Sequence, residues 1–223
     1  MQHLEEHNIP GEIVFNEISL RDRVKHIKAL VFDWDGVFNS GEKGEVPSSF
    51  NEIDSMGVNM LRFGYYLHNG ENPYTAIVTG ATNKTAKEWA EREHFHSVFF
   101  NVKHKADALD LMEKEYGVKR NEVLFVFDDI HDLSLAELVG SRFMVKNNGA
   151  QMFIQYCKEL NLCDYITQQT GANNALREIS EVTLDLLGLF RKTIELRTKF
   201  QGTYHTYLEE RNQVDTHFKK ITY

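Results

Sequence analysis

Two aspartates follow a run of apolar residues near the start of the chain. Residues 29–32 are apolar without a break and lead directly into Asp33, which is typical of a strand that is buried on both faces. Asp35 lies two positions on, so both carboxylates project to the same side if the backbone stays extended, and Gly36 then permits a sharp turn. Two carboxylates at one strand end can hold a hard cation, although a polar Asp/Gly turn without a ligand has the same local pattern.

Further polar groups follow other predicted strands. The strand at 74–78 is followed by Thr79 and Gly80, the strand at 98–100 by Lys105, and the strand at 123–127 by Asp128. In an open parallel sheet the carboxyl ends of the strands meet at one edge, so we expect these groups to converge there. Carboxylates, a hydroxyl and an ammonium at one edge suit a phosphate group bound together with Mg²⁺.

The order of the elements predicts an α/β fold. Predicted helices cover residues 58–67, 83–93, 105–116, 133–139, 152–160 and 175–190, with two further short strands at 143–145 and 165–166. Alternation of this kind predicts a Rossmann-like parallel sheet with helices on both faces, joined by right-handed crossovers. Residues 39–54 are rich in turn formers and predict a small hairpin flap.

The chain divides into a core at residues 1–190 and an extension at 191–223. The extension carries seven Lys/Arg against four Asp/Glu, a charge of +3, whereas the remainder carries −11. This composition predicts a helical C-terminal tail, one charged helix or a pair, that lies outside the sheet and packs against the acidic body.

The bulk composition excludes several classes of partner. With 223 residues and a net charge of −8, the chain has no general affinity for nucleic acid or anionic membrane, so a few placed groups must hold any anionic substrate. Cys157 and Cys163 lie in apolar surroundings, which predicts buried thiols. The first residues lack the apolar core of a signal peptide and no apolar run approaches about 18 residues, so we expect a cytoplasmic protein.

Four short motifs together resemble those of the haloacid dehalogenase superfamily of phosphohydrolases. They are Asp33-Trp34-Asp35-Gly36-Val37, Thr79-Gly80, Lys105, and the stretch from Asp128 and Asp129 to Asp132. Within the superfamily the chain is most similar to the capless 3-deoxy-D-manno-octulosonate 8-phosphate phosphatases, from about residue 24 to residue 187. The segments that carry this similarity are Phe50-Asn51 with Asp54, 77–80, 164–167, Gly171-Ala172 and 175–178.

The resemblance implies a role for each motif residue. Asp33 would be the nucleophile that forms an aspartyl-phosphate, and Asp35 the general acid and base, with its main-chain carbonyl helping to bind Mg²⁺. The implied metal-binding residues are Asp33, Asp35 and Asp128, with Asp129 and Asp132 as further ligands or as residues that orient the ligands. The implied substrate-binding residues are Asn39, Thr79, Gly80 and Lys105, of which Thr79 and Lys105 would hold the transferring phosphoryl group.

The resemblance also implies how the site is closed. The segment between Asp35 and the strand at 74–78 has room only for a flap and one helix, so no separate cap domain can be inserted there. The resembling family closes such sites by forming tetramers in which flaps and neighbouring chains wall the site. We therefore expect a homotetramer with the flap at a subunit boundary.

Because the sequence departs from the family pattern at four places, the resemblance does not identify the substrate. Phe127 stands where the family usually has Gly, Ala81 where an Arg is common, Ser55 where a Gly is usual, and the Lys that usually precedes Phe50 is absent. Phe127 either crowds the metal loop or belongs to the core. The favoured function is a Mg²⁺-dependent phosphomonoesterase for a small phosphorylated sugar acid of the ulosonate or sialic-acid type. The alternatives are a phosphatase of the same fold for another phosphometabolite, or a non-catalytic binding or assembly module.

The remaining conspicuous residues favour structural roles. His94, His96 and His104 are close in sequence but show no recognisable zinc-ligand spacing, so we read them as surface or core residues. His131 is near the predicted site and is interpreted as a bystander. Trp34 points opposite to the two aspartates in a regular strand and is expected to pack.

Overall fold

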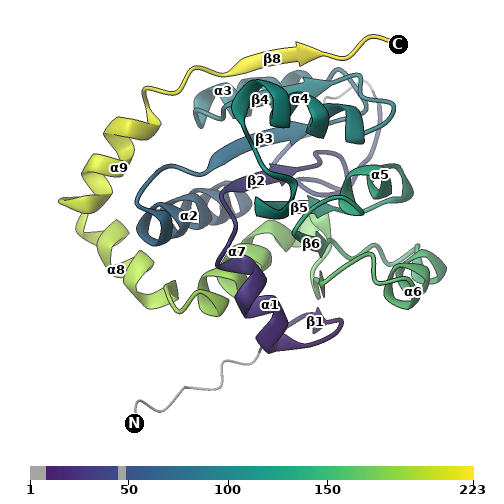
Figure 1. Cartoon of the computed structure of the whole chain (residues 1–223), viewed down its shortest axis with the longest axis horizontal. Helices are drawn as coiled ribbons and strands as arrows, with labels where there is room; N and C mark the ends of the chain where they lie inside the picture. The colour runs from purple at the N-terminus through teal and green to yellow at the C-terminus, as the bar shows by residue number, and fades with distance from the viewer. Residues whose placement is uncertain (1–8, 45–48) are drawn as a thin grey trace.

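The computed structural model describes residues 9–44 and 49–223, which contain one sheet of eight strands in the order β1-β7-β6-β5-β2-β3-β4-β8 (Figure 1). The strands are β1 (Glu12–Ile13), β2 (Ala29–Phe32), β3 (Tyr74–Val78), β4 (Ser97–Phe100), β5 (Val123–Phe127), β6 (Ser141–Met144), β7 (Tyr165–Ile166) and β8 (His217–Lys220). Neighbours in the sheet are parallel except for β1 and β7. The predicted α/β fold is confirmed, and the antiparallel edge strand β1 is an addition that the sequence did not indicate.

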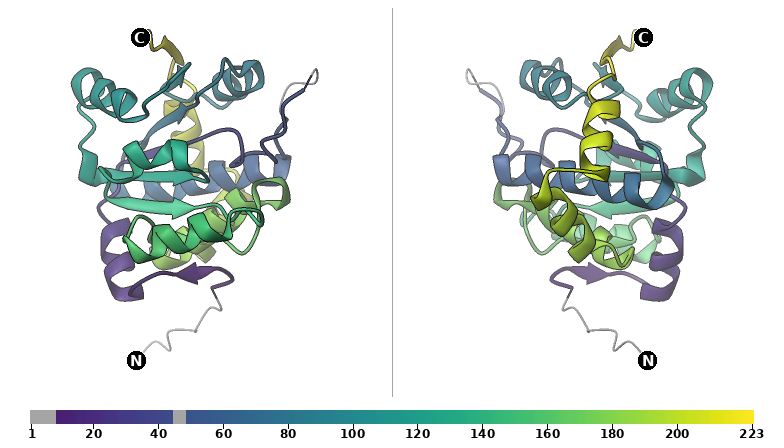
Figure 2. Two further views of the ribbon diagram at one scale, coloured as in Figure 1. Left: turned by 90° about the vertical axis from the view of Figure 1, so that its right-hand side faces the viewer. Right: turned by 90° about the vertical axis from the view of Figure 1, so that its left-hand side faces the viewer.

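Helices cover both faces of the sheet (Figure 2). On one face, buried side chains of the sheet pack against α1 (Glu17–Val24), α2 (Glu52–Asn69), α3 (Lys84–Arg92) and α7 (Ala175–Leu186). On the other face they pack against α4 (Ala106–Tyr116), α5 (Leu133–Ala136) and α6 (Gln151–Glu159). Within the described ranges, no separate folded domain is inserted into this frame between β2 and β3.

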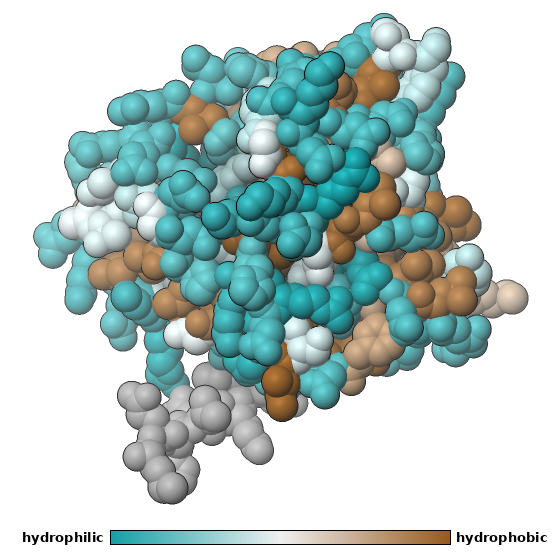
Figure 3. All heavy atoms as spheres, in the orientation of Figure 1, coloured by the Kyte–Doolittle hydropathy of each residue, from teal (hydrophilic) through white to brown (hydrophobic). Residues whose placement is uncertain are grey.

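The outer surface of the described residues is mostly polar, but α6 and its C-cap residue carry an apolar stripe. Met152, Tyr156 and Leu160 are 89%, 49% and 53% exposed, and their spacing of four residues puts them on one side of the helix. Figure 3 shows apolar side chains among polar ones on the side of the molecule where α5 and α6 lie. Exposed apolar residues that gather in this way mark a surface suited to contact with another molecule.

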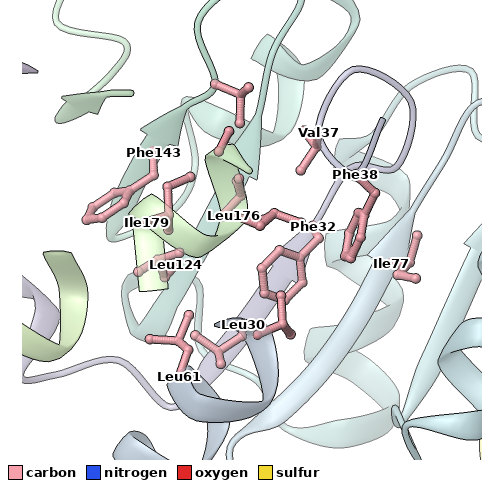
Figure 4. Packing of buried hydrophobic residues seen from close by; sticks show 14 of the residues in the cluster. Leu30, Phe32, Val37, Phe38, Leu61, Ile77, Leu124, Phe143, Leu176 and Ile179 are labelled. Atoms are coloured by element: carbon pink, nitrogen blue, oxygen red, sulfur yellow. The ribbon is translucent and has the colours of Figure 1, made fainter. Parts of the chain in front are cut away.

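The central strand β2 is buried on both faces. Leu30 and Phe32 belong to the core under α2 and α7, whereas Ala29 and Val31 belong to the core under α4 to α6. Figure 4 shows Leu30 and Phe32 packed among side chains from neighbouring strands and helices. This alternation is the period of two expected of a strand between two layers, and it explains why the sequence shows an unbroken apolar run.

Strand register brings the polar residues that follow three strands to one edge. Phe32 lies opposite Ile77 of β3 and Val126 of β5, so the chain leaves these three strands at nearly the same level. Asp33 follows Phe32 at once, and its N–H donates to the carbonyl of Val126 at 2.9 Å. The sheet therefore brings these strand ends together at one edge, as predicted.

Helix α2 begins earlier than the sequence predicted. It starts at Glu52 rather than at residue 58, because the Asn51 side chain accepts the N–H of Ile53 at 2.7 Å and caps the first turn. The predicted flap at 39–54 is corrected accordingly. Its residues 45–48 lie outside the described residues, its last three residues belong to α2, and the rest that is described contains no strand.

The extension forms two helices and a strand. Helices α8 (Phe190–Lys199) and α9 (Thr203–Arg211) agree with the predicted helical tail, but β8 pairs in parallel with β4 and extends the sheet. The expectation that the extension lies entirely outside the sheet is wrong. Figure 1 shows it running from α7 around the molecule to the edge opposite β1. Tyr204 and Tyr207 of α9 are buried against Phe63 and Tyr66 of α2.

Two predictions from bulk properties can be compared with the structure. Cys157 and Cys163 are buried and free, as predicted. In the described ranges no helix has both the length and the apolarity needed to cross a bilayer. The prediction about a signal peptide concerned residues 1–8, which lie outside the described residues.

Candidate active site

The loop after β2 is shaped by a glycine and an asparagine. Gly36 has φ +89°, and a Cβ atom there would lie 2.0 Å from Asp128 Oδ2, so only glycine fits at this point. Asn39 is buried, its Nδ2 donates to the Trp34 carbonyl at 3.4 Å, and its Oδ1 accepts the Gly41 N–H at 2.9 Å. Asn39 was predicted to bind substrate, but the structure uses both its polar atoms to hold the loop.

Trp34 anchors the same loop from below. Its ring stacks on Phe38 at 4.5 Å between centroids, and it is fully buried next to Trp89 of α3. The prediction that Trp34 packs rather than binds is confirmed. The side chains that alternate with it, Asp33 and Asp35, are therefore held on the opposite side by an aromatic cluster that cannot easily shift.

Three carboxylates gather where β2 and β5 end. Asp33, Asp128 and Asp132 each offer an oxygen within 4.8 Å of the others, and all three are buried. Lys105 lies among them, with its Nζ 2.5 Å from Asp33 Oδ1 and a second ion pair to Asp132. Since one ammonium faces three carboxylates, the cluster carries an excess of negative charge.

The buried charges perturb each other. Burial raises the pKa of Asp33 to about 6, against the attraction of Lys105. Burial, followed by repulsion from Asp33 and Asp132, raises the pKa of Asp128 to about 9. Burial acts to lower the pKa of Lys105, but attraction to Asp132 and Asp33 outweighs it and raises that pKa above its ordinary value. Lys105 therefore stays a cation, and the carboxylates compete for protons as long as no other cation joins them.

The loop before Lys105 is held from the neighbouring strand end. The Lys105 N–H donates to Ser134 Oγ at 3.1 Å, and His131 Nε2–H donates to the Val102 carbonyl at 3.0 Å. His131 was interpreted as a bystander. It lies outside the carboxylate cluster, but its contact with Val102 ties the segment after β5 to the loop that carries Lys105.

Asp132 orients the segment after β5. Its Oδ2 accepts the N–H groups of Asp128 at 3.3 Å and of Asp129 at 3.0 Å, while its Oδ1 faces Lys105. Asp129 is exposed, and its Oδ1 accepts the N–H of Ile130 at 2.7 Å. Asp129 was predicted among the metal-binding residues, but the structure places its side chain outside the carboxylate cluster, in a cap of the short helix at 130–132.

Asp35 points to a different part of the site. Its Oδ2 accepts Asn83 Nδ2 at 2.8 Å and also pairs with Lys43, whereas the clustered carboxylates are those of other residues. Asn83 Nδ2 also donates to Thr79 Oγ1 at 2.8 Å. Of the residues predicted for metal, Asp35 does not bring its carboxylate into the cluster, which leaves the main-chain carbonyl as its expected contribution.

Gly80, predicted to bind substrate, lies beside His131. A Cβ atom at Gly80 would lie 3.3 Å from His131 Nε2 and 3.6 Å from the Val102 carbonyl oxygen. The backbone at Thr79 and Gly80 thus passes close to the loop that leads to Lys105. Because Gly80 has no side chain, the backbone can pass this close to His131 and Val102. The neighbouring Thr79 carries the hydroxyl that was predicted to hold the phosphoryl group.

A second loop supports the Asp33 loop from outside. A Cβ atom at Gly171 would lie 2.0 Å from the Gly36 carbonyl oxygen and 2.5 Å from that of Asn39, so this loop lies directly on the turn. Glu178 holds it, since its carboxylate accepts the N–H groups of Gln168 at 2.7 Å and Gln169 at 2.8 Å. The segments around residues 171 and 178, which carry part of the family resemblance, therefore support the loop that bears Asp33.

The described carboxylates fit a divalent cation. Their oxygens are close, they are buried, and their charge exceeds that of the single ammonium, which is the donor set that Mg²⁺ or Mn²⁺ uses in proteins. Asp33, Asp128 and Asp132 would hold the ion. The three histidines named above do not join them: His94 contacts the Val214 carbonyl, His96 Nδ1 accepts the Thr75 N–H, and His104 contacts Asp107.

The raised pKa values predict how stability depends on pH without metal. The folded carboxylate cluster binds more protons than the same residues do in the unfolded chain between the ordinary carboxyl pKa of 3.8 and the raised value of about 9 at Asp128, so the contribution of the cluster to stability falls as pH rises through this window. We expect the metal-free protein to melt at a higher temperature at about pH 6 than at about pH 9, and Mg²⁺ to stabilise it most at the higher pH.

Asp128→Asn tests this directly. The variant should melt higher than the wild type at the alkaline end and should lose the stabilisation by Mg²⁺, as measured by calorimetry. Asp215→Asn, at an exposed position before β8, is the matched control and should change neither property. A wild type whose metal-free stability is flat across the window, or rises with pH, would contradict the electrostatic description of the cluster.

Comparisons with known proteins agree with this arrangement. No protein-family model matches the chain. The 3-deoxy-D-manno-octulosonate 8-phosphate phosphatase of Salmonella typhi is 25% identical over 168 residues, which are 73% of this chain and 81% of that protein. The crystal structure of the 3-deoxy-D-manno-octulosonate 8-phosphate phosphatase from Moraxella catarrhalis, in complex with magnesium ion, phosphate ion and KDO, is 25% identical, has a TM-score of 0.66 and covers 82% of this chain and 98% of that chain.

These matches extend over nearly the whole length of the solved relative, and the motif residues stand at the strand ends where the resemblance placed them. The chain belongs to the haloacid dehalogenase superfamily. Within the superfamily the chain is similar to the octulosonate phosphatases, and its enzyme class is phosphoric monoester hydrolase. The cobalt-bound octulosonate phosphatase of Haemophilus influenzae, 22% identical with a TM-score of 0.64, adds a further example of the same haloacid dehalogenase fold.

Proposed function

We propose that this haloacid dehalogenase superfamily member is a Mg²⁺-dependent phosphomonoesterase that hydrolyses a small phosphorylated sugar acid through an aspartyl-phosphate. The observation that carries the proposal is the position of Asp33, whose carboxylate lies at the end of the central strand, 2.5 Å from Lys105 Nζ and beside Asp128 and Asp132. Such a group can attack a phosphorus atom while the ammonium and the cation hold the phosphate oxygens.

The first step forms the covalent intermediate. A carboxylate oxygen of Asp33 attacks phosphorus, the bond from phosphorus to the leaving oxygen breaks, and Asp35 gives its proton to that oxygen. The products of this step are an alcohol and an aspartyl-phosphate. Lys105 and the Thr79 hydroxyl stabilise the phosphoryl oxygens, on which negative charge is spread in the transition state.

The second step regenerates the site. Asp35, now a carboxylate, takes a proton from water, the water oxygen attacks phosphorus, and the bond to Asp33 breaks to release inorganic phosphate. Bound Mg²⁺ supplies charge neutralisation of the phosphate oxygens when it is present. The protein's own contribution is to project Asp33 and Asp35 into the site from one loop, whose other side is fixed by the packing of Trp34.

The substrate class comes from the relatives and not from a contact in this chain. The matched relatives act on 3-deoxy-D-manno-octulosonate 8-phosphate, and identity of 25% supports a phosphorylated sugar acid of that type. One observation favours a different phosphometabolite as the second candidate. Position 81 carries Ala, so the charged contact that an Arg would offer to a substrate acid is missing beside Thr79. Five motif residues retained at the strand ends weigh against a non-catalytic module.

A panel of phosphorylated metabolites, assayed for phosphate release with Mg²⁺ and with a chelator, tests the function. We expect hydrolysis of octulosonate 8-phosphate or a related sugar-acid phosphate, abolished by the chelator and restored by Mg²⁺. Preference for a neutral sugar phosphate would favour the second candidate. Absence of Mg²⁺-dependent hydrolysis across the panel, with a folded protein, would refute the proposed phosphomonoesterase.

We also propose a homotetramer in which residues next to the flap meet a neighbouring chain. Ile53 and Met56, in the first turn of α2 where it overlaps the end of the flap, are 50% and 40% exposed, and their spacing of three residues puts two large apolar side chains on one exposed face that suits contact with another chain. Contact between subunits at this point would wall a site that no cap domain covers.

Sedimentation of the full chain at micromolar concentration is expected to give a tetramer. Ile53→Glu combined with Met56→Glu should shift it toward smaller species and lower activity together, whereas Ile18→Glu on α1 serves as a control at a different exposed apolar position. A full-length protein that is monomeric and fully active would contradict closure of the site by neighbouring subunits.

A further inference from the structure

We infer that Asn83 is a positioning residue of the reaction, which holds the Asp35 carboxylate in place for proton transfer and ties it to Thr79. The inference rests on the proposed function and deepens it. Asn83 was not singled out by its sequence context, since it lies at the start of α3, four residues after Thr79.

The geometry of the amide carries the argument. Asn83 Nδ2 lies 2.8 Å from Asp35 Oδ2 and 2.8 Å from Thr79 Oγ1. An amide nitrogen has two hydrogens, so it can donate one to the carboxylate and one to the hydroxyl at the same time. One side chain thereby links the proposed acid and base to the hydroxyl proposed to hold the phosphoryl group.

The Asn83 side chain does not make the capping hydrogen bond that is usual for its position in a helix. Asparagine at a helix N-cap usually accepts a backbone N–H of the first turn, and Asn83 occupies the N-cap position of α3 without making such a bond. Its backbone is nonetheless fixed by the helix, because its carbonyl accepts the N–H of Lys87 at 3.2 Å. Asn83 forgoes a favourable capping hydrogen bond and instead contacts residues of the site, which indicates that its side chain has a role in the site.

Lys43 also contacts Asp35 but is anchored differently. It comes from the loop after β2 and is 57% exposed, so its long side chain pays a larger entropic cost to hold one position. Asn83 is short and starts from a helix terminus. We therefore assign the fixed orientation of Asp35 to Asn83, with Lys43 as an adjustable second contact.

The role predicts a dependence on the leaving group. In the first step Asp35 gives its proton to the leaving oxygen, and a poor leaving group such as an alkyl alkoxide needs that proton, whereas p-nitrophenolate departs without it. Misplacing Asp35 should therefore slow this first step far more with an alkyl phosphate than with p-nitrophenyl phosphate. A loss of general stability would slow both alike.

The experiment compares the Mg²⁺-loaded wild type with Asn83→Ala and Asn83→Ser on a sugar phosphate and on p-nitrophenyl phosphate. We expect the single-turnover rate of the first step, followed as release of the alcohol, to fall about 10- to 100-fold for the sugar phosphate and less than about 5-fold for the aryl ester. This rate excludes the second step, in which Asp35 acts as a base for both substrates alike. Calorimetric titration with inorganic phosphate should show a few-fold weaker binding through Thr79. The control is Thr82→Val, which removes the nearby bond from Thr82 Oγ1 to Asn101 Oδ1 and should leave the ratio of the two rates unchanged.

Each of the other possible results contradicts either the positioning role of Asn83 or the proposed function. Equal losses on both substrates, or no loss on the sugar phosphate, would overturn the positioning role while leaving the proposed function in place. A wild type inert toward both esters would refute the proposed function, and the inference with it. Asn83→Ser can still cap α3, so a selective loss in this variant separates the role in the site from any effect on folding.

Discussion

Asp33→Asn is expected to lower kcat by about 10³-fold or more, because the amide cannot form the acyl-phosphate bond. The substitution keeps the shape of the side chain, so the contact with Lys105 is retained in weaker form and the loop over Trp34 is unaffected. The measurement is the single-turnover rate of phosphate release with saturating Mg²⁺.

The matched variant is Asp129→Asn. Asp129 is exposed and caps the helix at 130–132, so its substitution removes a neighbouring negative charge without touching the carboxylate cluster. We expect less than about 10-fold loss in this variant. Comparable rates for the wild type and Asp33→Asn would show that Asp33 is not the nucleophile.

Phe127→Ala is expected to lower the free energy of unfolding by about 3–5 kcal/mol, as for other large aromatic side chains removed from a core. Phe127 is fully buried, and its ring stacks on Phe125 at 5.7 Å between centroids, in the core under α4 to α6. Of the two interpretations offered by the sequence, the burial favours core packing over crowding of the metal loop.

Chemical denaturation beside a Mg²⁺ titration separates the two interpretations. Phe127→Leu serves as the control, since it fills most of the space and should cost much less than Ala. If Phe127 instead narrowed the metal loop, Phe127→Ala would change Mg²⁺ affinity while leaving the free energy of unfolding nearly unchanged. That result would contradict the packing role assigned here.

The parts of the fold that the sequence predicted are those with strong local patterns. Residues 29–32 are apolar because β2 is buried on both faces, and Asp33 is found where this run ends. The convergence of Asp33, Thr79, Lys105 and Asp128 followed from the rule that parallel strands end at one edge. Asp132, which the family resemblance implied as a ligand or an orienting residue, joins that group, with its oxygens on both Lys105 and the backbone after β5.

The parts that the sequence did not predict depend on long-range contacts. β8 has the sequence His-Phe-Lys-Lys, without an apolar pattern, and is a strand because β4 presents an open edge and Lys219 pairs with Glu115 at 2.7 Å. Asp129 and Asp132 lie in the same short turn, and the sequence does not indicate that Asp132 points into the carboxylate cluster whereas Asp129 caps the helix outside it. Asn83 resembles an ordinary helix cap in the sequence, and only the folded sheet shows that it faces Asp35.

The most direct test of the mechanism is to find the phosphoryl group on Asp33. The wild type is mixed with substrate and Mg²⁺, quenched in acid during turnover, digested, and mapped by mass spectrometry. The proposed mechanism predicts a phosphorylated peptide containing Asp33 that is absent without Mg²⁺ and absent in Asp33→Asn. Phosphate release without any phosphorylated peptide at times within the first turnover, or a phosphoryl group on a different residue, would contradict it.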